Sequence, residues 1–424
     1  MEQTVKDKKN RTLIITLAVI AIFLFGYFQY NTFLSKLGQN KESVGKTNSS
    51  YNALVNLERS KVEKAEDQAD FKLAAKGAVL LDAKSNHVLY SKNGNEELPM
   101  ASTTKIMTCI VALEYGNLDD VVTFSKRAAS MPDVQLNAKT GAKFKLGDLL
   151  YSLMLESHND TAVAIAEHVG GSVEGFAKMM NKKVKELGLS HTNFVTPNGL
   201  DAVEHYTTAK ELAIIASYAI KNEKFVEITN TPNWSFKEES SKSTYNVQNK
   251  NRFLSLMPGA MGVKTGFTNN AGYCFVGALK RDDKTLISVV LGSGWPPHKT
   301  YKWRDTQYLM NYGLDHFGYR NVSENLQPLY DVRVINGKQD AIKLEMDDST
   351  KDVLLRNSDE VDIMYNIPDQ LEAPVKKGDQ IGTVTYYING EKYKDVPVTS
   401  KNTVAKKDYR FCLDKIIDLF LSAW

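Results

Sequence analysis

Two regions of the chain have the short apolar runs and turn sequences that are typical of β-strands. Gly77–Asp82 is an apolar run, and His87–Tyr90 reads as the returning strand after a turn, so the pattern predicts a hairpin. Near residue 260 the pattern resumes as MGVKTGF, AGYCFVGALKR and TLISVVLGS, with turn sequences at 268–270 and 282–284. These segments predict antiparallel strands contributed by both ends of one domain.

The residues between these two regions have helical periodicity instead. From Ser102 to about Gly116 apolar side chains lie nearly all round, which predicts a buried helix with Ser102 at its N-terminus. Further helices are predicted at 146–170, 176–188, 207–221 and 310–317. A hairpin, a helical middle and closing strands predict an α/β sandwich of the α+β kind, with an antiparallel sheet and a helical subdomain.

After Asn325 short alternating segments are separated by Gly and Asp turns, which predicts a small all-β sandwich. A last helix is predicted at 409–424, and it has one apolar face. That face carries Leu413, Ile416, Ile417, Phe420, Leu421 and Trp424, whereas Asp414, Lys415, Asp418 and Ser422 lie opposite. Such a helix either docks on protein or lies in a membrane interface, and the pattern leaves both open.

The N-terminal region begins with basic residues followed by an apolar run from Thr12 to Phe28. This combination fits either a signal peptide or a membrane anchor. The sequence after Phe28 offers no good small-x-small cleavage site, which favours an uncleaved anchor. The basic flank then predicts a cytoplasmic N-terminus, with the rest of the chain outside. The polar segment that follows is interpreted as a stalk.

Length and composition agree with this division. A chain of 424 residues with 42% hydrophobic and 24% charged residues is globular and long enough for two domains. The predicted parts are an N-terminal anchor or signal segment at 1–30, a stalk at 31–70, a catalytic domain at 71–322, a β-rich domain at 325–405 and an amphipathic helix at 406–424.

Charge and cysteine content exclude several classes of function. The net charge is only +3, and no arginine-rich stripe is present, so nucleic acid is not an expected partner. The three cysteines include no CxxC pair, so we expect neither a metal site nor a disulfide framework, although spacing alone permits a bond between Cys109 and Cys274. No cofactor is expected.

Three short motifs carry the candidate chemistry, and the first pairs a serine with a lysine. Ser102 and Lys105 are three residues apart, so they share one face of a helix. A serine hydroxyl needs a base, and a lysine amine serves when burial or a second cation lowers its pKa. We therefore predict Ser102 as nucleophile and Lys105 as general base.

The second motif is Ser157-His158-Asn159. Ser157 is predicted to relay a proton to the leaving amine, and Asn159 is predicted to orient Lys105 and hold an amide of the substrate. The alternative is that both are ordinary polar groups at a helix terminus. His158 is not expected to act as the base, because a residue between two that face a cleft points elsewhere.

The third motif, Lys264-Thr265-Gly266, lies on a predicted strand. Lys264 supplies the second cation, and with the Thr265 hydroxyl it can bind a free carboxylate. Gly266 leaves the strand open to substrate. The backbone N–H of Phe267 can form an oxyanion hole with that of Ser102. Each motif alone is weak evidence, but the ordered set describes serine acyl transfer without a catalytic histidine.

This motif set resembles that of class A β-lactamases and penicillin-binding proteins. The longer segments LPMASTTKIMT, LMLESHNDTAVAIAEHVGG, HYTTAKELA and GVKTGFTNNAGYCFVGALKR resemble the serine-type D-alanyl-D-alanine carboxypeptidases among the low-molecular-mass penicillin-binding proteins. The likeness spans residues 71–317 and implies a β-lactamase/transpeptidase-like fold. The β-rich segment resembles the C-terminal domain of many members, and the last helix resembles their membrane-associating tail.

The resemblance implies that the enzyme removes the terminal D-alanine from peptidoglycan stem peptides through an acyl-enzyme on Ser102, and that β-lactams acylate the same serine. It also implies a bacterial cell membrane location with the catalytic domain on the extracytoplasmic side. Many relatives have glycine in place of His158 and histidine in place of Phe267. Some place an arginine after the last core strand, where this chain offers Lys299 or Arg304.

Two other functions compete with this interpretation. A β-lactamase needs a glutamate that activates the deacylating water, but Glu167, Glu174 and Glu186 all lie in segments predicted to be helical. A catalytically silent wall-binding or scaffold protein would not need the motif residues, all of which are present. Both remain weaker hypotheses than the carboxypeptidase.

Overall fold

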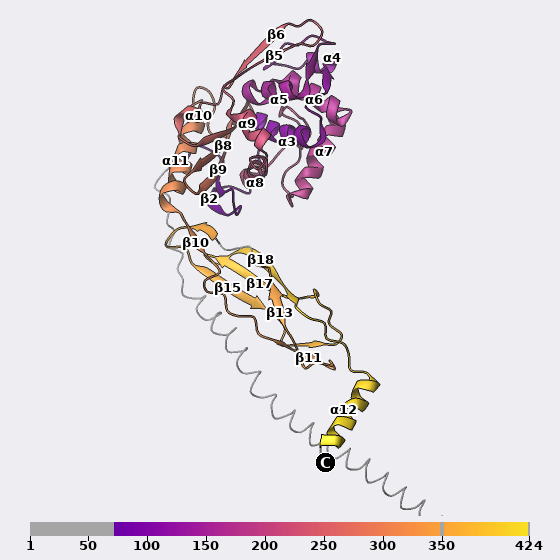
Figure 1. Cartoon of the computed structure of the whole chain (residues 1–424). Coiled ribbons are helices and arrows are strands. Elements are labelled where there is room, and N and C mark those ends of the chain that lie inside the picture. Colours follow the sequence, from indigo (N-terminus) through magenta and orange to yellow (C-terminus); the bar gives the residue numbers. More distant parts are fainter. Residues whose placement is uncertain (1–71, 348–351, 423–424) are drawn as a thin grey trace, which may run out of the picture. The chain divides into compact units, whose positions relative to one another are not determined.

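A five-stranded antiparallel sheet forms the centre of the region between residues 72 and 317 (Figure 1). The computed structural model describes residues 72–347 and 352–422. The strand order is β2-β1-β9-β8-β7, so the two ends of the domain meet in one sheet, as predicted. The strands are β1 (Gly77–Asp82), β2 (Val88–Lys92), β7 (Ala260–Thr268), β8 (Gly272–Arg281) and β9 (Lys284–Leu291).

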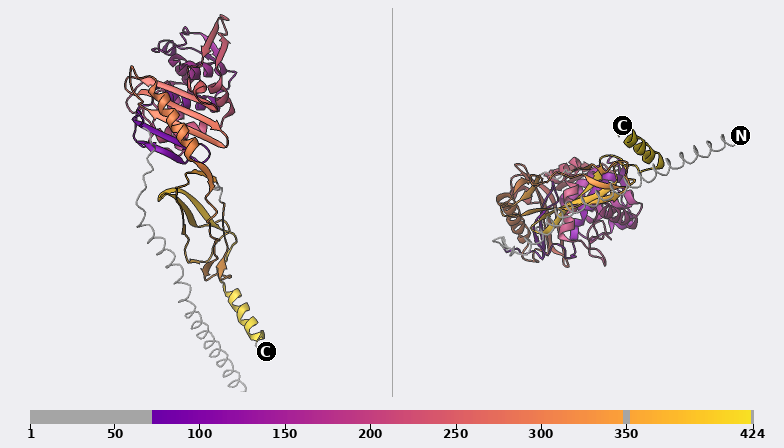
Figure 2. Two further views of the ribbon diagram at one scale, coloured as in Figure 1. Left: turned by 90° about the vertical axis from the view of Figure 1, so that its left-hand side faces the viewer. Right: turned by 90° about the horizontal axis from the view of Figure 1, so that it is seen from below.

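Side chains alternate between the two faces of this sheet and build two cores. On β1, Val79 and Leu81 join the core beneath the helical subdomain, whereas Ala78 and Leu80 join the core beneath α11 (Tyr301–His316). Figure 2 shows α11 lying across one face of the sheet, with the helical subdomain on the opposite face. The expected sandwich with an antiparallel sheet is therefore confirmed.

The helical subdomain holds most of the remaining elements. Its helices are α3 (Lys105–Tyr115), α4 (Lys126–Ala129), α5 (Leu146–Tyr151), α6 (Asn159–Gly170), α7 (Val173–Glu186), α8 (Ala209–Ala219) and α9 (Glu223–Asn230). The short α10 (Phe253–Leu256) instead packs in the same core as α11. Two small antiparallel two-stranded sheets accompany these helices: β3 (Val121–Thr123) with β4 (Lys143–Lys145), and the hairpin of β5 (Asn233–Lys237) with β6 (Thr244–Gln248).

Three predicted helix boundaries are wrong. The helix expected from Ser102 begins with a 3₁₀ turn at Ala101–Thr104, and α3 follows it. The single helix expected at 146–170 is broken, because a π turn at Ser152–Glu156 leads into the left-handed residue Ser157, where φ is 71°. α11 begins at Tyr301, well before the predicted start at residue 310, and Trp303 in its first turn packs against Phe275 of β8.

The C-terminal region is rich in β-structure, as expected. Its strands are β10 (Gly318–Asn321), β11 (Val332–Ile335), β12 (Ala341–Ile342), β13 (Leu344–Met346), β14 (Asp352–Leu355), β15 (Val361–Asn366), β16 (Gln370–Glu372), β17 (Gln380–Ile388) and β18 (Glu391–Ser400). β13, β18, β17 and β15 form its largest sheet, which is antiparallel. A separate apolar core that includes Val332, Val384 and Val398 holds the region together.

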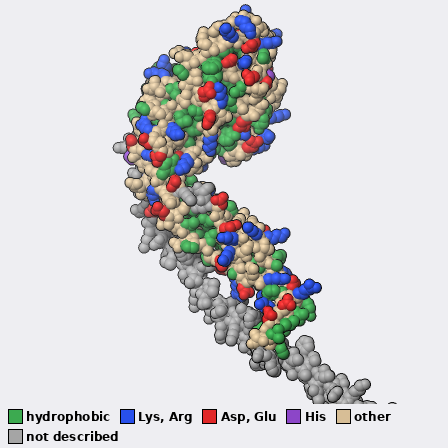
Figure 3. Space-filling view, in the orientation of Figure 1, with side chains coloured by type: hydrophobic (Ala, Val, Ile, Leu, Met, Phe, Trp, Pro, Cys, Tyr) green, Lys and Arg blue, Asp and Glu red, His purple; other side chains and the backbone are tan. Residues whose placement is uncertain are grey.

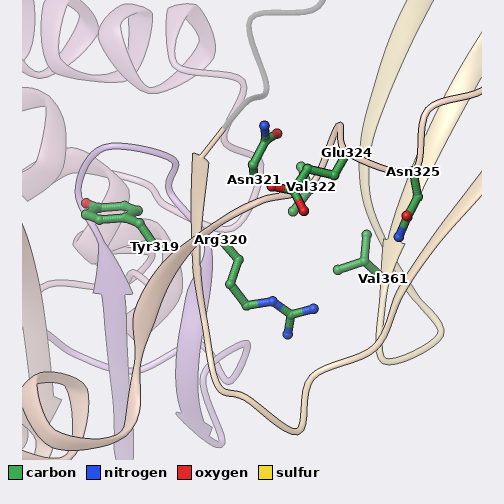
Figure 4. A pocket seen from close by; sticks show the side chains of 7 residues that line it. All are labelled: Tyr319, Arg320, Asn321, Val322, Glu324, Asn325 and Val361. Carbon is green, nitrogen blue, oxygen red and sulfur yellow. The ribbon is translucent and has the colours of Figure 1, made fainter.

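A cavity of about 300 Å³ opens at the start of this region, between β10 and β15 (Figure 4). Arg320 and Val361 line it from these two strands. The Arg320 guanidinium already donates hydrogen bonds to the backbone carbonyls of Arg356 and Asp359, at 3.0 and 2.8 Å. The cavity contains none of the motif residues.

The last helix, α12 (Tyr409–Ser422), has no buried residue among those that the structure describes. Leu413, Ile416 and Phe420 are 41%, 60% and 52% exposed.

Within the described ranges, no helix combines the length and apolar character needed to cross a bilayer. The anchor or signal segment and the stalk, predicted at 1–30 and 31–70, lie outside the described residues. Cys109 and Cys274 are both free and buried.

Candidate active site

Ser102 and Lys105 meet where the 3₁₀ turn passes into α3. The amine Nζ of Lys105 lies 2.9 Å from Ser102 Oγ, 2.8 Å from Asn159 Oδ1 and 2.6 Å from the backbone carbonyl of Asn198. The last two partners only accept hydrogen bonds. A neutral amine has two N–H bonds for them, so its lone pair remains for the proton of the Ser102 hydroxyl.

Burial favours the neutral form of the Lys105 amine. Lys105 is fully buried, and this desolvation together with the positive charge of Lys264 holds the pKa of Lys105 well below its usual value. Asp160 acts in the opposite direction but more weakly. The geometry therefore suits proton transfer from Ser102 to Lys105.

His205 contacts the 3₁₀ turn that carries Ser102. Its Nδ1 accepts the backbone N–H of Val195 at 2.9 Å, so in the neutral ring Nε2 carries the proton. Nε2 lies 2.9 Å from Thr104 Oγ1, which donates in turn to the carbonyl of Ala101 at 2.8 Å. Burial lowers the pKa of His205 to about 4. The sequence analysis missed this residue, although it opens the HYTTAKELA segment.

The second motif lies at the junction between the π turn and α6. Asn159 is buried, and its Oδ1 accepts from Lys105 while its Nδ2 donates to the carbonyls of Pro132 and Asp133, each at 3.1 Å. Among the described residues, the buried Ser157 hydroxyl has no hydrogen-bond partner. Such an unpaired hydroxyl is available to a ligand. His158 is turned away from Ser102, as expected.

The third motif lies on β7, the edge strand of the sheet. Lys264 and Gly266 pair with Val276 and Cys274, whose side chains belong to the core beneath the helical subdomain. Lys264 and Gly266 therefore face the subdomain that carries Ser102. A side chain at Gly266 would place its Cβ 3.0 Å from the backbone N of Ser102, so any larger residue requires the Ser102 turn to shift. Thr265 alternates to the other face.

Lys264 is almost fully buried, and its Nζ donates to the carbonyl of Thr265 at 3.1 Å. Burial and the positive charge of Lys302 lower the pKa of Lys264 to about 7. Phe267 is partly exposed, and its ring contacts Tyr273 with centroids 4.6 Å apart. A substrate carboxylate requires a positive potential here, and Lys264 and Lys302 provide it together with the strand edge.

Lys302 is a further cation that sequence reasoning missed. Its Nζ lies 4.8 Å from the ring centroid of Tyr273, and burial lowers its pKa to about 8. Of the two residues suggested at this place by the resemblance, Arg304 pairs with the buried Asp305 at 3.2 Å and Lys299 is exposed. The described residues contain no cluster of His, Cys, Asp or Glu suited to a metal ion.

Comparison with known proteins identifies the family. The family model described as D-alanyl-D-alanine carboxypeptidase matches residues 62–294, and the one described as the C-terminal domain of penicillin-binding protein 5 matches residues 317–406. The chain belongs to the D-alanyl-D-alanine carboxypeptidase family. It is 35% identical to D-alanyl-D-alanine carboxypeptidase DacF of Bacillus subtilis, over 79% of this chain and 87% of that protein.

Two further relatives agree with this assignment. D-alanyl-D-alanine carboxypeptidase DacC of Escherichia coli is 31% identical, over 76% of this chain and 82% of that protein. The crystal structure of penicillin-binding protein 5 from Haemophilus influenzae superposes with a TM-score of 0.66 at 29% identity, and the match covers 80% of this chain and all of that one. The resemblance inferred from the motifs is confirmed at the level of the family.

Proposed function

We propose that this protein is a serine carboxypeptidase that removes the terminal D-alanine from peptidoglycan stem peptides ending in D-Ala-D-Ala, through an acyl-enzyme on Ser102. The observation that carries the proposal is the contact of Lys105 with Ser102, Asn159 and the Asn198 carbonyl. Membership of the D-alanyl-D-alanine carboxypeptidase family supports the choice of substrate.

In the acylation step Lys105 takes the hydroxyl proton as Ser102 Oγ bonds to the carbonyl carbon of the penultimate D-alanine. The carbonyl oxygen becomes an oxyanion, which the backbone N–H groups of Ser102 and Phe267 stabilise. Lys264, which faces the subdomain that carries Ser102, binds the carboxylate of the terminal D-alanine. When the tetrahedral intermediate collapses, Ser157 gives its proton to the leaving amine and takes the proton held by Lys105. Lys105 is then neutral again as D-alanine departs.

In the deacylation step a water molecule attacks the ester carbonyl, and Lys105 takes its proton. The ester bond to Ser102 then breaks, and the serine oxygen recovers a proton as the shortened stem peptide leaves. A β-lactam acylates Ser102 by the same route. Its ring-opened amine remains attached to the adduct, so the acyl-enzyme persists.

The competing functions receive no support. Glu167 lies on α6, and Glu174 and Glu186 lie on α7, so these glutamates are held in helices rather than in a loop above the serine. DacF of Bacillus subtilis and DacC of Escherichia coli are named carboxypeptidases. A silent scaffold would have no need for a buried lysine with a depressed pKa beside a serine.

Release of D-alanine from a diacyl-L-Lys-D-Ala-D-Ala peptide tests the proposal. We expect the wild-type protein to release D-alanine. In Ser102→Ala the rate of release should fall by more than about 10³-fold, because removal of a nucleophile eliminates the covalent step. Ser240→Ala, at an exposed serine far along the chain, serves as the control. Release by Ser102→Ala at the wild-type rate would contradict the assignment.

We further propose that the N-terminal apolar run and α12 bring the enzyme to the outer surface of the bacterial cell membrane. The exposed apolar residues of α12 support the second contact. The visible face in Figure 3 carries interspersed basic and acidic side chains elsewhere, with hydrophobic side chains gathered on α12.

Cys412 offers a direct test of the α12 contact, because it is exposed whereas Cys109 and Cys274 are buried. A polarity-sensitive maleimide dye on Cys412 should shift to the blue when phosphatidylglycerol vesicles are added. The same labelled protein with Phe420→Glu should not respond. An unchanged spectrum in the unsubstituted protein would refute contact through this helix.

A further inference from the structure

The backbone that leads to Ser157 is irregular. A π turn (Ser152–Glu156) precedes it, and Ser157 itself has a φ of 71°, a left-handed conformation that costs energy for a residue with a side chain. π turns and strained residues occur often at functional sites, where the surrounding structure must hold them. The question is which contacts maintain this conformation.

The side chain of His158 spans this turn. It is 4% exposed, and its Nδ1 lies 2.8 Å from Ser152 Oγ at the start of the π turn. Its Nε2 lies 3.3 Å from Glu156 Oε2 at the end of the turn. Ser152 Oγ is also 2.9 Å from Thr161 Oγ1 on α6. The imidazole of the residue that follows Ser157 thus contacts both ends of the π turn that precedes it.

Glu156 anchors this arrangement to the β5–β6 hairpin. Its Oε1 accepts the backbone N–H of Gln248 at 2.9 Å and lies 3.3 Å from Lys250 Nζ. Partial burial opposes ionisation, but the Gln248 and Lys250 contacts hold the pKa of Glu156 below its usual value. An ionised carboxylate only accepts hydrogen bonds. His158 Nε2 must therefore carry a proton, and Nδ1 accepts from the Ser152 hydroxyl.

The ring is neutral near pH 7. Burial lowers the pKa of His158, with Lys105 acting in the same direction, while Asp160 and Glu156 favour the protonated form but do not outweigh burial. Both ring nitrogens are occupied by groups away from Ser102. His158 is therefore not placed to exchange protons with the nucleophile.

We infer that His158 is a positioning residue that holds Ser157 in its left-handed conformation through the Nε2–Glu156 contact. This inference rests on the proposed function, in which Ser157 passes a proton to the leaving amine. The chemical step depends on the placement of Ser157, so loss of the ring lowers kcat and leaves KM nearly unchanged.

The test uses the full chain and D-alanine release from diacyl-L-Lys-D-Ala-D-Ala. We expect His158→Ala to lower kcat about 10- to 100-fold, the size of effect that a small misplacement of a catalytic group produces. His158→Gln retains a donor that reaches Glu156 and should recover most of this loss, whereas His158→Asn reaches only Ser152 and should not. His168→Ala, at the last turn of α6, is the matched control.

Folding and proposed function are tested separately. Thermal unfolding shows whether each variant is folded, and stoichiometric penicillin adducts by intact mass show that Ser102 still reacts. Nitrogen-15 NMR of labelled histidine should give Nδ1 of His158 as the unprotonated nitrogen at pH 7. If the wild type releases no D-alanine, the proposed function fails. If the wild type is active and folded His158→Ala keeps kcat within about 2-fold, or Gln recovers no more than Asn, the positioning role is refuted.

Discussion

Replacement of Lys264 by methionine should stabilise the protein while it disables the site. Lys264 is 2% exposed, and the described structure gives its Nζ one hydrogen bond, to the carbonyl of Thr265. Burial and the charge of Lys302 lower its pKa from 10.5 to about 7. A buried lysine with so little compensation opposes folding, and methionine has a similar length without the charge.

The size of the effect follows from the difference in pKa between the folded and unfolded chains. At pH 7 Lys264 is protonated in the unfolded chain, whereas burial disfavours the protonated form in the folded chain. This difference lowers the free energy of unfolding by about 4 kcal/mol. Because the unfolded state binds more protons between pH 7 and 10.5, this cost decreases as the pH rises and is lost near 10.5. The lost hydrogen bond to Thr265 offsets about 1 kcal/mol.

The assay is thermal unfolding of the full chain at pH 7 and near pH 10. Lys264→Met should raise the midpoint of the catalytic-domain transition by roughly 5–10 °C at pH 7, from ~2–4 °C per kcal/mol for a domain of this size. The gain should decrease steeply toward pH 10. Lys299→Met, at an exposed lysine, is the control. A midpoint at pH 7 that is unchanged or lower would refute the argument, as would a gain independent of pH.

Three further predictions concern the same site. Lys302→Met removes a charge that lowers the pKa of Lys264, so the alkaline limb of kcat/KM should move to higher pH, and an unmoved limb in a full pH profile would count against the coupling. Gly266→Ala should slow penicillin acylation at least about tenfold, because the alanine Cβ would lie 3.0 Å from the Ser102 backbone N. Stopped-flow acylation rates equal to those of the wild type would contradict this close approach. His205→Ala should lower kcat for D-alanine release about tenfold or more, because the 3₁₀ turn is displaced when its hydrogen bond to His205 is lost. His205→Gln keeps a donor and should recover activity. Equal losses of kcat in both variants would argue against a role for this hydrogen bond.

Much of the fold follows from the apolar pattern. The strands β1, β7, β8 and β9 appear where alternating or continuous apolar segments end at turn residues, because a sheet covered on both faces requires such segments. The buried helix α3 follows from apolar residues on all sides. These are consequences of burial, which residue type encodes directly.

The finer features of the site depend on contacts that residue types do not reveal. The π turn before Ser157 is held by His158 and by a hairpin nearly one hundred residues further along the chain. The third partner of Lys105 is a backbone carbonyl, that of Asn198, and any residue has one. His205 acts through an Nε2–H that becomes evident only when the donor to Nδ1 is known. Helical periodicity could not predict these long-range interactions.

The central claim is that Ser102 is the residue that becomes acylated. Intact mass spectrometry after incubation with penicillin, followed by peptide mapping, tests it most directly. We predict one penicillin per chain, located on the peptide that contains Ser102, and no adduct on Ser102→Ala. An adduct mapped to any other residue, or one that persists in Ser102→Ala, would contradict the account.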